Sequence, residues 1–309
     1  MSPAPVAPAG DRVTRAGGHD VFVAGIYDEP EFYAAACAYR DVAADVTALL
    51  RWWKLFGTGG PVPSTVLELA AGPAEHARAL AARGADVTAL DINPVMCAFA
   101  RAQAAKAGLR LAVVEGDMRD FRIAEPARFN LAITMLNSLC HLMTLDDLLA
   151  HLGSVAAHLA DGGLYVAELA HPADFLSGEP STSSEWSTDI DGGKVTVRWG
   201  GRRDHIDPVT QVTREHVTVT YRQKDGSART VTDVVPNRFW TGTEFEAAVR
   251  LAGGLSVVAQ YGDFDGDIAL DAPGAWRMIF VLRRGGPAAI TDSSGESAGS
   301  GPGSPPLPG

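Results

Sequence analysis

Cysteine is scarce in this chain of 309 residues, and its spacing excludes several classes of protein. Only Cys37, Cys97 and Cys140 occur, and no two of them have the CxxC spacing of a zinc or redox site. An odd, scattered set provides no disulfide framework, so we expect a reducing compartment and thiols that are small buried apolar groups. His151 and His158 have no third ligand at metal-site spacing, so we expect them at the surface or at an interface and predict no metal centre.

The chain also lacks a long hydrophobic run and an excess of positive charge. No segment is typical of a signal peptide or a membrane span, which predicts a cytoplasmic protein without a membrane partner. The formal net charge is −11, and nucleic acid is not expected as a partner because phosphate binding requires a basic surface. Residues 1–19 are rich in Pro, Ala and Gly, and residues 285–309 in Gly, Ser and Pro. We expect a flexible leader and a disordered tail there.

Two apolar runs that each carry a carboxylate at their end are the most informative feature present. Residues 66–69 read Val-Leu-Glu-Leu and lead into a turn of small residues at 70–74, and the run 85–90 is followed by Asp91. Parallel strands that deliver carboxylates at their carboxyl ends form a site for a nucleoside-bearing cofactor. Glu68 would repel the pyrophosphate of a dinucleotide, whereas an acidic pocket favours the sulfonium and ammonium groups of S-adenosylmethionine. The pattern therefore favours S-adenosylmethionine.

Strand-like and helical patterns alternate with short links from residue 64 to residue 170, which predicts a doubly wound parallel sheet. After Leu169, polar and apolar residues alternate, which predicts an antiparallel insertion before a last helix and two strands complete the sheet. Helices are predicted within 31–55, over 74–83, from Pro94 onward, over 145–159 and over 243–251. Strands are predicted at 66–69, 87–90, 110–114, 129–136, 164–169, 255–261 and 275–282 in the sheet, and at 194–199, 212–221 and 229–235 in the insertion.

These patterns define the expected fold and domain organisation. We predict an α/β fold with a doubly wound, Rossmann-like, seven-stranded sheet, N-terminal helices and an antiparallel β insertion after strand five. The core would comprise residues 20–173 and 241–284, and the insertion residues 174–240 would cover the substrate. Exposed strand edges in that insertion would favour a homodimer.

Five segments resemble, in the same order, the motifs of class I S-adenosylmethionine-dependent methyltransferases. They are residues 66–74, Asp91, residues 115–118, residues 129–138 and residues 159–163. The last segment resembles the family's turn before strand five, so we expect a turn at residues 161–163. The resemblance covers about residues 27–284. The loop 70–74 keeps one glycine of the family's three, a departure that disfavours a dinucleotide more strongly than S-adenosylmethionine.

A narrower resemblance points to enzymes with small-molecule substrates. Tyr27 and Asp28, the antiparallel insertion and residues 261–266 are similar to the sugar N,N-dimethyltransferases and the glycine N-methyltransferase-like enzymes. In that subgroup the insertion covers the substrate and sometimes mediates dimer contacts. The resemblance therefore implies a small-molecule substrate beneath the insertion.

The resemblance also implies particular contacts with the cofactor. Asp91 would bind the ribose hydroxyls, Glu68 would lie near the ammonium end, and Asp117 and Met118 would flank the adenine. From the residues alone, Glu68 could instead accept a backbone N–H, Asp117 could cap a turn, and Met118 could belong to the core. Tyr27 could form a lid over the cofactor or anchor the first helix. The predicted cofactor-binding residues are Tyr27, Glu68, Ala70, Gly72, Asp91, Ile92, Asp117, Met118, Leu136 and Asn137.

Three residues near the ends of strands four and five are candidates for proton transfer. Glu168 and His171 close strand five, and His141 follows strand four at the crevice where ligands bind in such sheets. Glu168 could instead pair with an arginine of the insertion, such as Arg198 or Arg202. His141 could instead pack beneath a short helix that Asn137 or Ser138 caps. We predict Glu168, His171 and His141 as the catalytic residues.

The insertion carries aromatic and basic side chains, of which about half must face solvent on alternating strands. A subset facing the crevice would form an aromatic wall with one or two cations. We predict Trp186, Trp199, Arg238 and Trp240 as substrate-binding residues.

The predicted function is transfer of a methyl group from S-adenosylmethionine to a nitrogen or oxygen of a small molecule. Class I methyltransferases have no universal catalytic residue, so a non-catalytic cofactor-binding relative is an alternative. Methylation of an activated carbon is another. A nicotinamide-dependent oxidoreductase is disfavoured by Glu68 and by the missing glycines.

Overall fold

The computed structural model describes residues 25–123, 128–176, 184–190, 192–264 and 268–285. The leader predicted at 1–19, nearly all of the predicted tail and residues 265–266 of the 261–266 motif lie outside these ranges. No helix within the described ranges is long and apolar enough to cross a membrane.

The core is a seven-stranded sheet in the order β10-β11-β5-β4-β1-β2-β3. Strands β1 to β5 are parallel, and β11 runs antiparallel to both of its neighbours. The predicted seven-stranded, doubly wound α/β fold is therefore confirmed. The strands are β1 (Thr65–Leu69), β2 (Asp86–Asp91), β3 (Ala112–Glu115), β4 (Phe129–Thr134), β5 (Leu159–Ala170), β10 (Leu255–Tyr261) and β11 (Arg277–Arg284).

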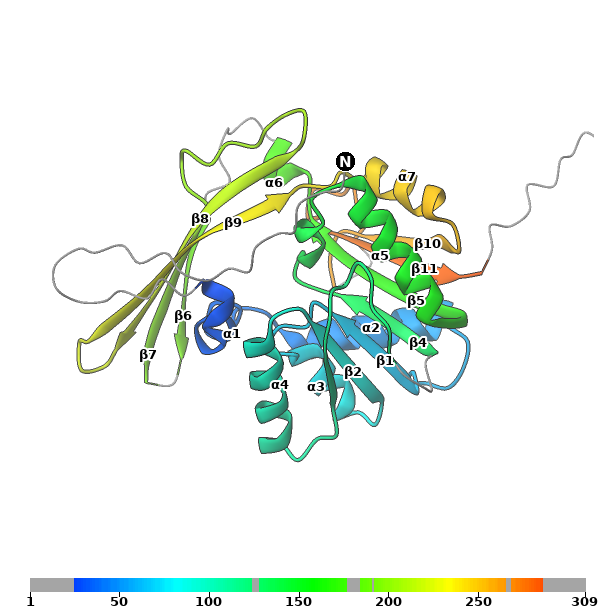
Figure 1. Ribbon diagram of the computed structural model, residues 1–309, viewed down its shortest axis with the longest axis horizontal. Helices are drawn as coiled ribbons and strands as arrows, with labels where there is room; N and C mark the ends of the chain where they lie inside the picture. Colours follow the sequence, from blue (N-terminus) through cyan, green and yellow to red (C-terminus); the bar gives the residue numbers. More distant parts are fainter. Residues whose placement is uncertain (1–24, 124–127, 177–183, 191, 265–267, 286–309) are drawn as a thin grey trace, which may run out of the picture.

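Helices cover both faces of this sheet (Figure 1). Successive side chains of a strand point to opposite faces, so each strand contributes to two cores. On one face Val66 packs in a cluster with α2 (Val42–Phe56) and α3 (Glu75–Ala81). On the other face Leu67 packs in a cluster with α5 (Leu145–His158) and α7 (Gly242–Ala252). The remaining helices are η1 (Ile26–Asp28), α1 (Pro30–Ala36), α4 (Pro94–Lys106), η2 (Ser138–His141) and α6 (Ala173–Leu176).

A second sheet of four antiparallel strands follows β5, as predicted for the insertion. It stands beside the core, with α1 against it (Figure 1). Ile26, Phe32 and Ala36 of the N-terminal helices form one buried cluster with the valines of its inner face. The N-terminal segment therefore joins the second sheet to the core. The strands are β6 (Ser184–Ile190), β7 (Gly193–Trp199), β8 (Val212–Gln223) and β9 (Ala228–Arg238).

Two parts of the predicted strand assignment need correction. Strand β6 was not predicted; it is an edge strand whose side chains are exposed or only partly buried, so no apolar alternation marks it. Strand β5 begins at Leu159 and includes the Gly162 and Gly163 that we predicted to form a turn. Gly162 has a φ of +73°, and the pairing of β5 with β4 shifts in register between Phe129 and Leu131. A bulge thus replaces the turn.

Candidate functional site

The two predicted carboxylates lie at the carboxyl ends of neighbouring strands. Glu68 is on β1 and Asp91 ends β2, and both are at most 9% exposed. Oε2 of Glu68 accepts the Ala77 N–H at 2.7 Å. Oδ2 of Asp91 accepts the Gly72 N–H at 2.6 Å, and its Oδ1 accepts the Asn93 N–H at 2.8 Å. The backbone partner considered for Glu68 is therefore present, and Asp91 fixes the loop that follows β1.

The loop 70–74 is a tight turn of small residues. Ala70, Gly72 and Ala74 have φ values of +49°, +51° and +57°, the left-handed region that favours glycine. Beside it lies a small cavity of about 20 Å³. Its walls are residues 70–73 of this loop, Glu68, Glu75, His76, Met135 and four residues that also line a second, larger cavity. These four are Tyr33, Cys37, Leu136 and Ser138.

The residues at this edge of the sheet fit S-adenosylmethionine. The loop contributes no side chain larger than the proline ring, so a ligand can approach its backbone closely. The carboxylate of Asp91 retains lone pairs with which it can accept further hydrogen bonds. Ile92, the next residue, is 64% exposed, an apolar side chain on which an adenine ring could pack. The acidic and apolar groups are thus arranged in the order in which the cofactor presents its ammonium, ribose and adenine.

Asp117 and Met118, predicted to flank the adenine, have internal partners in the structure. Asp117 accepts hydrogen bonds from the Arg119 backbone at 2.9 Å and from its guanidinium at 2.6 Å. Burial acts to raise the pKa of Asp117, but these bonds outweigh it and hold the pKa below its usual value. Met118 is 8% exposed and belongs to the core cluster. The contacts considered as alternatives are therefore both present: Asp117 caps a turn, and Met118 packs in the core.

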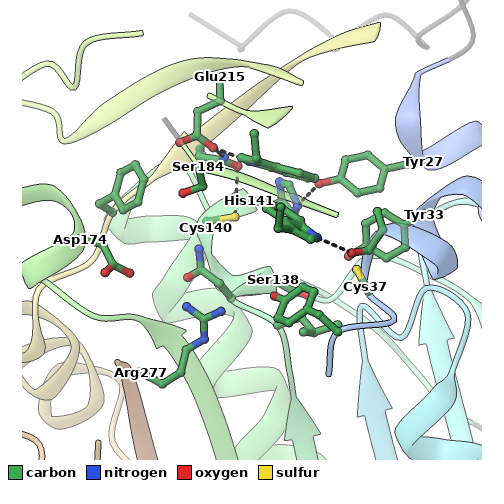
Figure 2. A pocket seen from close by; sticks show the side chains of 18 of the residues that line it. Tyr27, Tyr33, Cys37, Ser138, Cys140, His141, Asp174, Ser184, Glu215 and Arg277 are labelled. Atoms are coloured by element: carbon green, nitrogen blue, oxygen red, sulfur yellow. Dashed lines mark hydrogen bonds between the residues drawn. The ribbon is translucent and has the colours of Figure 1, made fainter. Parts of the chain in front are cut away.

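The larger cavity has a volume of about 440 Å³ and lies between the carboxyl edge of the core sheet and the inner face of the second sheet. Figure 2 shows Tyr27 and Tyr33 on one side of it, Asp174 and Arg277 on the other, and Glu215 at the top. The predicted residues that line this cavity are Tyr27, Leu136, Asn137, His141, Trp186 and Trp199.

His141 and Tyr27 form a polar pair in the wall of this cavity. Their Nε2 and hydroxyl oxygen are 3.2 Å apart, and the two rings are nearly perpendicular. Burial lowers the pKa of His141, so the imidazole is neutral at physiological pH. The pKa of Tyr27 is raised well above its usual value, also by burial, so its hydroxyl stays protonated. A neutral imidazole in a cavity wall is a group that can accept a proton.

Glu215 in the cavity wall was not predicted. It is 3% exposed, and its Oε2 accepts hydrogen bonds from Trp199 Nε1 at 2.7 Å and from Asn237 Nδ2. These three side chains come from β8, β7 and β9, and Cys140 donates to Asn237 Oδ1 at 3.2 Å, which links them to the core. A sequence signal existed, since Glu215 has the same strand parity as the buried Val217 and so falls on the apolar face of β8.

Two of the three cysteines also line the larger cavity, although we predicted all three as small buried apolar groups. Cys97 and Cys140 are buried, whereas Cys37 is partly exposed. Burial raises the pKa of Cys37 to about 12 and that of Cys140 further still. Neither thiol is therefore ionised at neutral pH. Within the described ranges no cluster of His, Cys, Asp and Glu could hold a metal ion.

Glu168 and His171 lie outside the set of described residues that line the two cavities. Glu168 is fully buried; its Oε1 lies 2.9 Å from Arg40 Nη1 and 3.0 Å from Arg277 Nε, and its Oε2 accepts the Leu136 N–H at 2.8 Å. The partner expected from the insertion is wrong, since Arg198 pairs with Glu185 instead. The His171 ring lies 3.0 Å from the Leu270 carbonyl.

The other two predicted substrate residues, Arg238 and Trp240, contact each other. The Arg238 guanidinium lies 3.7 Å from the centre of the Trp240 ring, and neither residue is in the wall of the larger cavity. Trp240 is 3% exposed, and its Nε1 donates to the Leu139 carbonyl at 3.3 Å. Their position at the end of β9 joins the second sheet to the core.

The surface position predicted for His151 is wrong. Its side chain is fully buried, with Nδ1 2.9 Å from the Met118 carbonyl and Nε2 2.7 Å from the Tyr165 hydroxyl. Burial lowers its pKa to about 4, so this ring is neutral. His158 lies about two helical turns further along α5 and is only partly buried.

Comparisons with known proteins agree with this geometry. Residues 66–163 match a family model described as a methyltransferase domain. The chain is 28% identical over 215 residues, 70% of its length and 83% of the relative's, to the dTDP-3-amino-3,4,6-trideoxy-alpha-D-glucopyranose N,N-dimethyltransferase of Streptomyces venezuelae. It is 32% identical over 160 residues to the dTDP-3-amino-3,6-dideoxy-alpha-D-glucopyranose N,N-dimethyltransferase of Streptomyces fradiae, an alignment that covers 52% of this chain and 56% of that relative.

A solved structure extends the comparison to the whole fold. An S-adenosylmethionine-bound amino pentose methyltransferase from Micromonospora echinaspora superposes with a TM-score of 0.62 at 22% identity, covering 87% of this chain and 100% of that one. The sheet order, the carboxylates that end β1 and β2, and the matched domain define a class I methyltransferase. The chain is an S-adenosylmethionine-dependent methyltransferase, and S-adenosylmethionine is its cofactor.

Proposed function

We propose that this enzyme methylates the amino nitrogen of an amino sugar that binds in the larger cavity. The observation that carries the proposal is the neutral His141 in the wall of that cavity, paired with Tyr27 and accompanied by the carboxylates of Asp174 and Glu215. Carboxylates in the wall attract a cationic amine, and a neutral imidazole accepts its proton.

The proton on the substrate is the chemical problem that His141 would solve. An aliphatic amine is largely protonated at neutral pH, and an ammonium group has no lone pair with which to attack a methyl carbon. An imidazole of lowered pKa in the cavity wall is unprotonated under the same conditions. One ring N–H of His141 donates to the Pro236 carbonyl, so the lone pair is on Nε2, beside the Tyr27 hydroxyl. The Tyr27 hydroxyl would give its proton to Nε2 and receive one from the ammonium group, so that His141 takes up the proton.

The cofactor would lie along the carboxyl edge of β1 and β2. We infer that its ammonium end lies near Glu68 and Gly72, that Asp91 accepts the ribose hydroxyls, and that the adenine packs near Ile92. When bound, S-adenosylmethionine supplies an electrophilic methyl group on a sulfonium. The cavity at the loop and the larger cavity share the wall formed by Tyr33, Cys37, Leu136 and Ser138, so the two ligands would meet there, aligned and shielded from water.

The relatives support nitrogen rather than oxygen as the acceptor. Both curated relatives are named as N,N-dimethyltransferases of dTDP-linked amino sugars, and the solved relative is an amino pentose methyltransferase. A cytoplasmic location, a homodimer and the lack of a nucleic-acid partner stay predictions.

A substrate panel with the purified enzyme and S-adenosylmethionine tests the proposal. The probe is dTDP-3-amino-3,6-dideoxy-glucose, and its matched control is the same sugar nucleotide with a hydroxyl in place of the amine. We expect one or two methyl groups to be added to the amine by mass spectrometry and none to the control. Equal methylation of both compounds would contradict an amine-specific site, and turnover of only the hydroxyl compound would make the enzyme an O-methyltransferase.

A further inference from the structure

A continuous series of charged side chains, most of them buried, connects the walls of the two cavities. It starts at Arg277 in the larger cavity and ends at Glu68 in the small one. Its internal members come from the α1–α2 link, α2, α3 and β5. Each member pairs with the next in space, in the order Arg277, Glu168, Arg40, Asp45, His76 and Glu68.

His76 is the member of this series that lies beside the loop 70–74. Its Nε2 is 3.0 Å from Asp45 Oδ2 and its Nδ1 is 3.5 Å from Glu68 Oε1. The side chains of all three residues are at most 6% exposed. An imidazole that faces a carboxylate from each ring nitrogen can donate to both only when it is protonated.

The charges around His76 favour the imidazolium. Burial alone would lower the pKa of His76, but the hydrogen bonds and charges of Asp45 and Glu68 outweigh burial and raise the pKa to about 9. Arg40 pairs with Asp45 from the far side, at 2.8 Å, and also with Glu168.

Other charged groups lie near this cluster but do not interrupt it. Glu75, on the same helix as His76, also lines the small cavity and pairs with Arg78 at 3.8 Å. Asp91 on β2 is close enough to Glu68 for the Glu68 charge to raise its pKa, after the larger effect of burial. With His76 protonated, this series of side chains holds equal numbers of cations and anions. The cations are Arg277, Arg40 and His76, and the anions are Glu168, Asp45 and Glu68.

We propose that His76, as the imidazolium, is a positioning residue that fixes the Glu68 carboxylate for the ammonium end of S-adenosylmethionine. Ala77 N–H holds one oxygen of Glu68 at 2.7 Å, and His76 faces the other. Loss of the proton would remove that donor and leave an uncompensated negative charge in a buried cluster. This inference rests on the proposed placement of the ammonium end beside Glu68, and it is independent of the substrate.

The test is calorimetric affinity for two ligands in wild type and His76→Asn at pH 7. S-adenosylhomocysteine has the amino-acid end of the cofactor, whereas 5′-methylthioadenosine lacks it. We expect the variant to bind S-adenosylhomocysteine about 10- to 100-fold more weakly, the effect of losing a charge-assisted hydrogen bond, and to bind methylthioadenosine as wild type does. His158→Asn, on the far side of the core, is the matched control and should change neither affinity.

Two results would overturn the proposal. Unchanged affinity for S-adenosylhomocysteine would remove any role for His76 in binding, and an equal loss for both ligands would mean that the whole loop is distorted. Because the variant could fail to fold, the imidazole of His76 is also titrated by NMR in the wild-type protein. A pKa near 9 is expected, and titration near 6.5 would show that the ring is uncharged when the cofactor binds.

Discussion

Three histidines of this enzyme do not all have the same charge, because their neighbours differ. His76 faces two carboxylates, which raise its pKa to about 9. His151 lies between a carbonyl and a tyrosine hydroxyl, and burial lowers its pKa to about 4. His141 in the cavity wall is also neutral, with a pKa lowered by burial. The sequence identified His141 from its position after strand four, but it could not indicate which rings are protonated, because that depends on contacts across elements.

His141→Asn tests the proposed base at the residue scale. The variant keeps a polar group beside Tyr27 but cannot take a proton, so kcat should fall by about 10²-fold at pH 7. In wild type, kcat should be level above neutral pH and fall as the pH drops below the ordinary histidine pKa, since protonation removes the acceptor lone pair. Steady-state rates over pH 5.5 to 9 measure both effects. If the variant keeps the wild-type rate and the wild-type acid limb, His141 is not the base.

Asp91→Ala tests the proposed ribose contact. Loss of the carboxylate removes the acceptor for the ribose and for the Gly72 and Asn93 N–H groups, so cofactor affinity should fall by about 10²-fold or more with the fold retained. Calorimetry measures the affinity and circular dichroism the fold. Asp86→Ala, at the exposed start of the same strand, is the control. An unchanged affinity in Asp91→Ala would remove the ribose assignment.

At the scale of elements, apolar runs predicted the strands of the core because buried parallel strands require them. The edge strand β6 has no such pattern and was missed. The partners of Glu168 also escaped prediction, because Arg40 and Arg277 are 128 and 109 positions away from it in the sequence and only the fold brings them together. Their contacts connect β5, β11 and the α1–α2 link, which makes this ion cluster a junction between the core sheet and the N-terminal helices.

Glu168→Gln separates the predicted catalytic role of this residue from a structural one. Removing one partner of a buried ion pair leaves Arg277 without this carboxylate and Arg40 with only its pair to Asp45, so the free energy of unfolding should fall by about 3–5 kcal/mol. Urea denaturation measures this loss. Glu185→Gln, which breaks the exposed pair with Arg198, should cost at most about 1 kcal/mol. A variant of normal stability whose kcat has collapsed would favour the catalytic role instead.

At the scale of the whole molecule, the core sheet and the second sheet meet at the larger cavity. In the proposal, the core sheet is the cofactor half of the enzyme and the second sheet is the substrate half. The cofactor half follows from short sequence motifs, because each motif ends a strand at the same edge of one sheet. The substrate half could be predicted only as an antiparallel insertion. Trp186 and Trp199 face the cavity, on the side of the second sheet that packs against α1. Arg238 and Trp240 do not, because Trp240 lies beyond the end of β9 in the core cluster, and the Arg238 guanidinium lies over its ring.

The most direct test of the central claim is to identify the atom that receives the methyl group. The enzyme is incubated with the dTDP-linked 3-amino sugar and S-adenosylmethionine carrying a ¹³C label in the transferred methyl, and the product is examined by carbon–proton NMR. We expect the label on the amino nitrogen, as an N-methyl or N,N-dimethyl group. A label on a sugar oxygen or carbon would contradict the account, and so would an unlabelled sugar from an enzyme that binds both ligands.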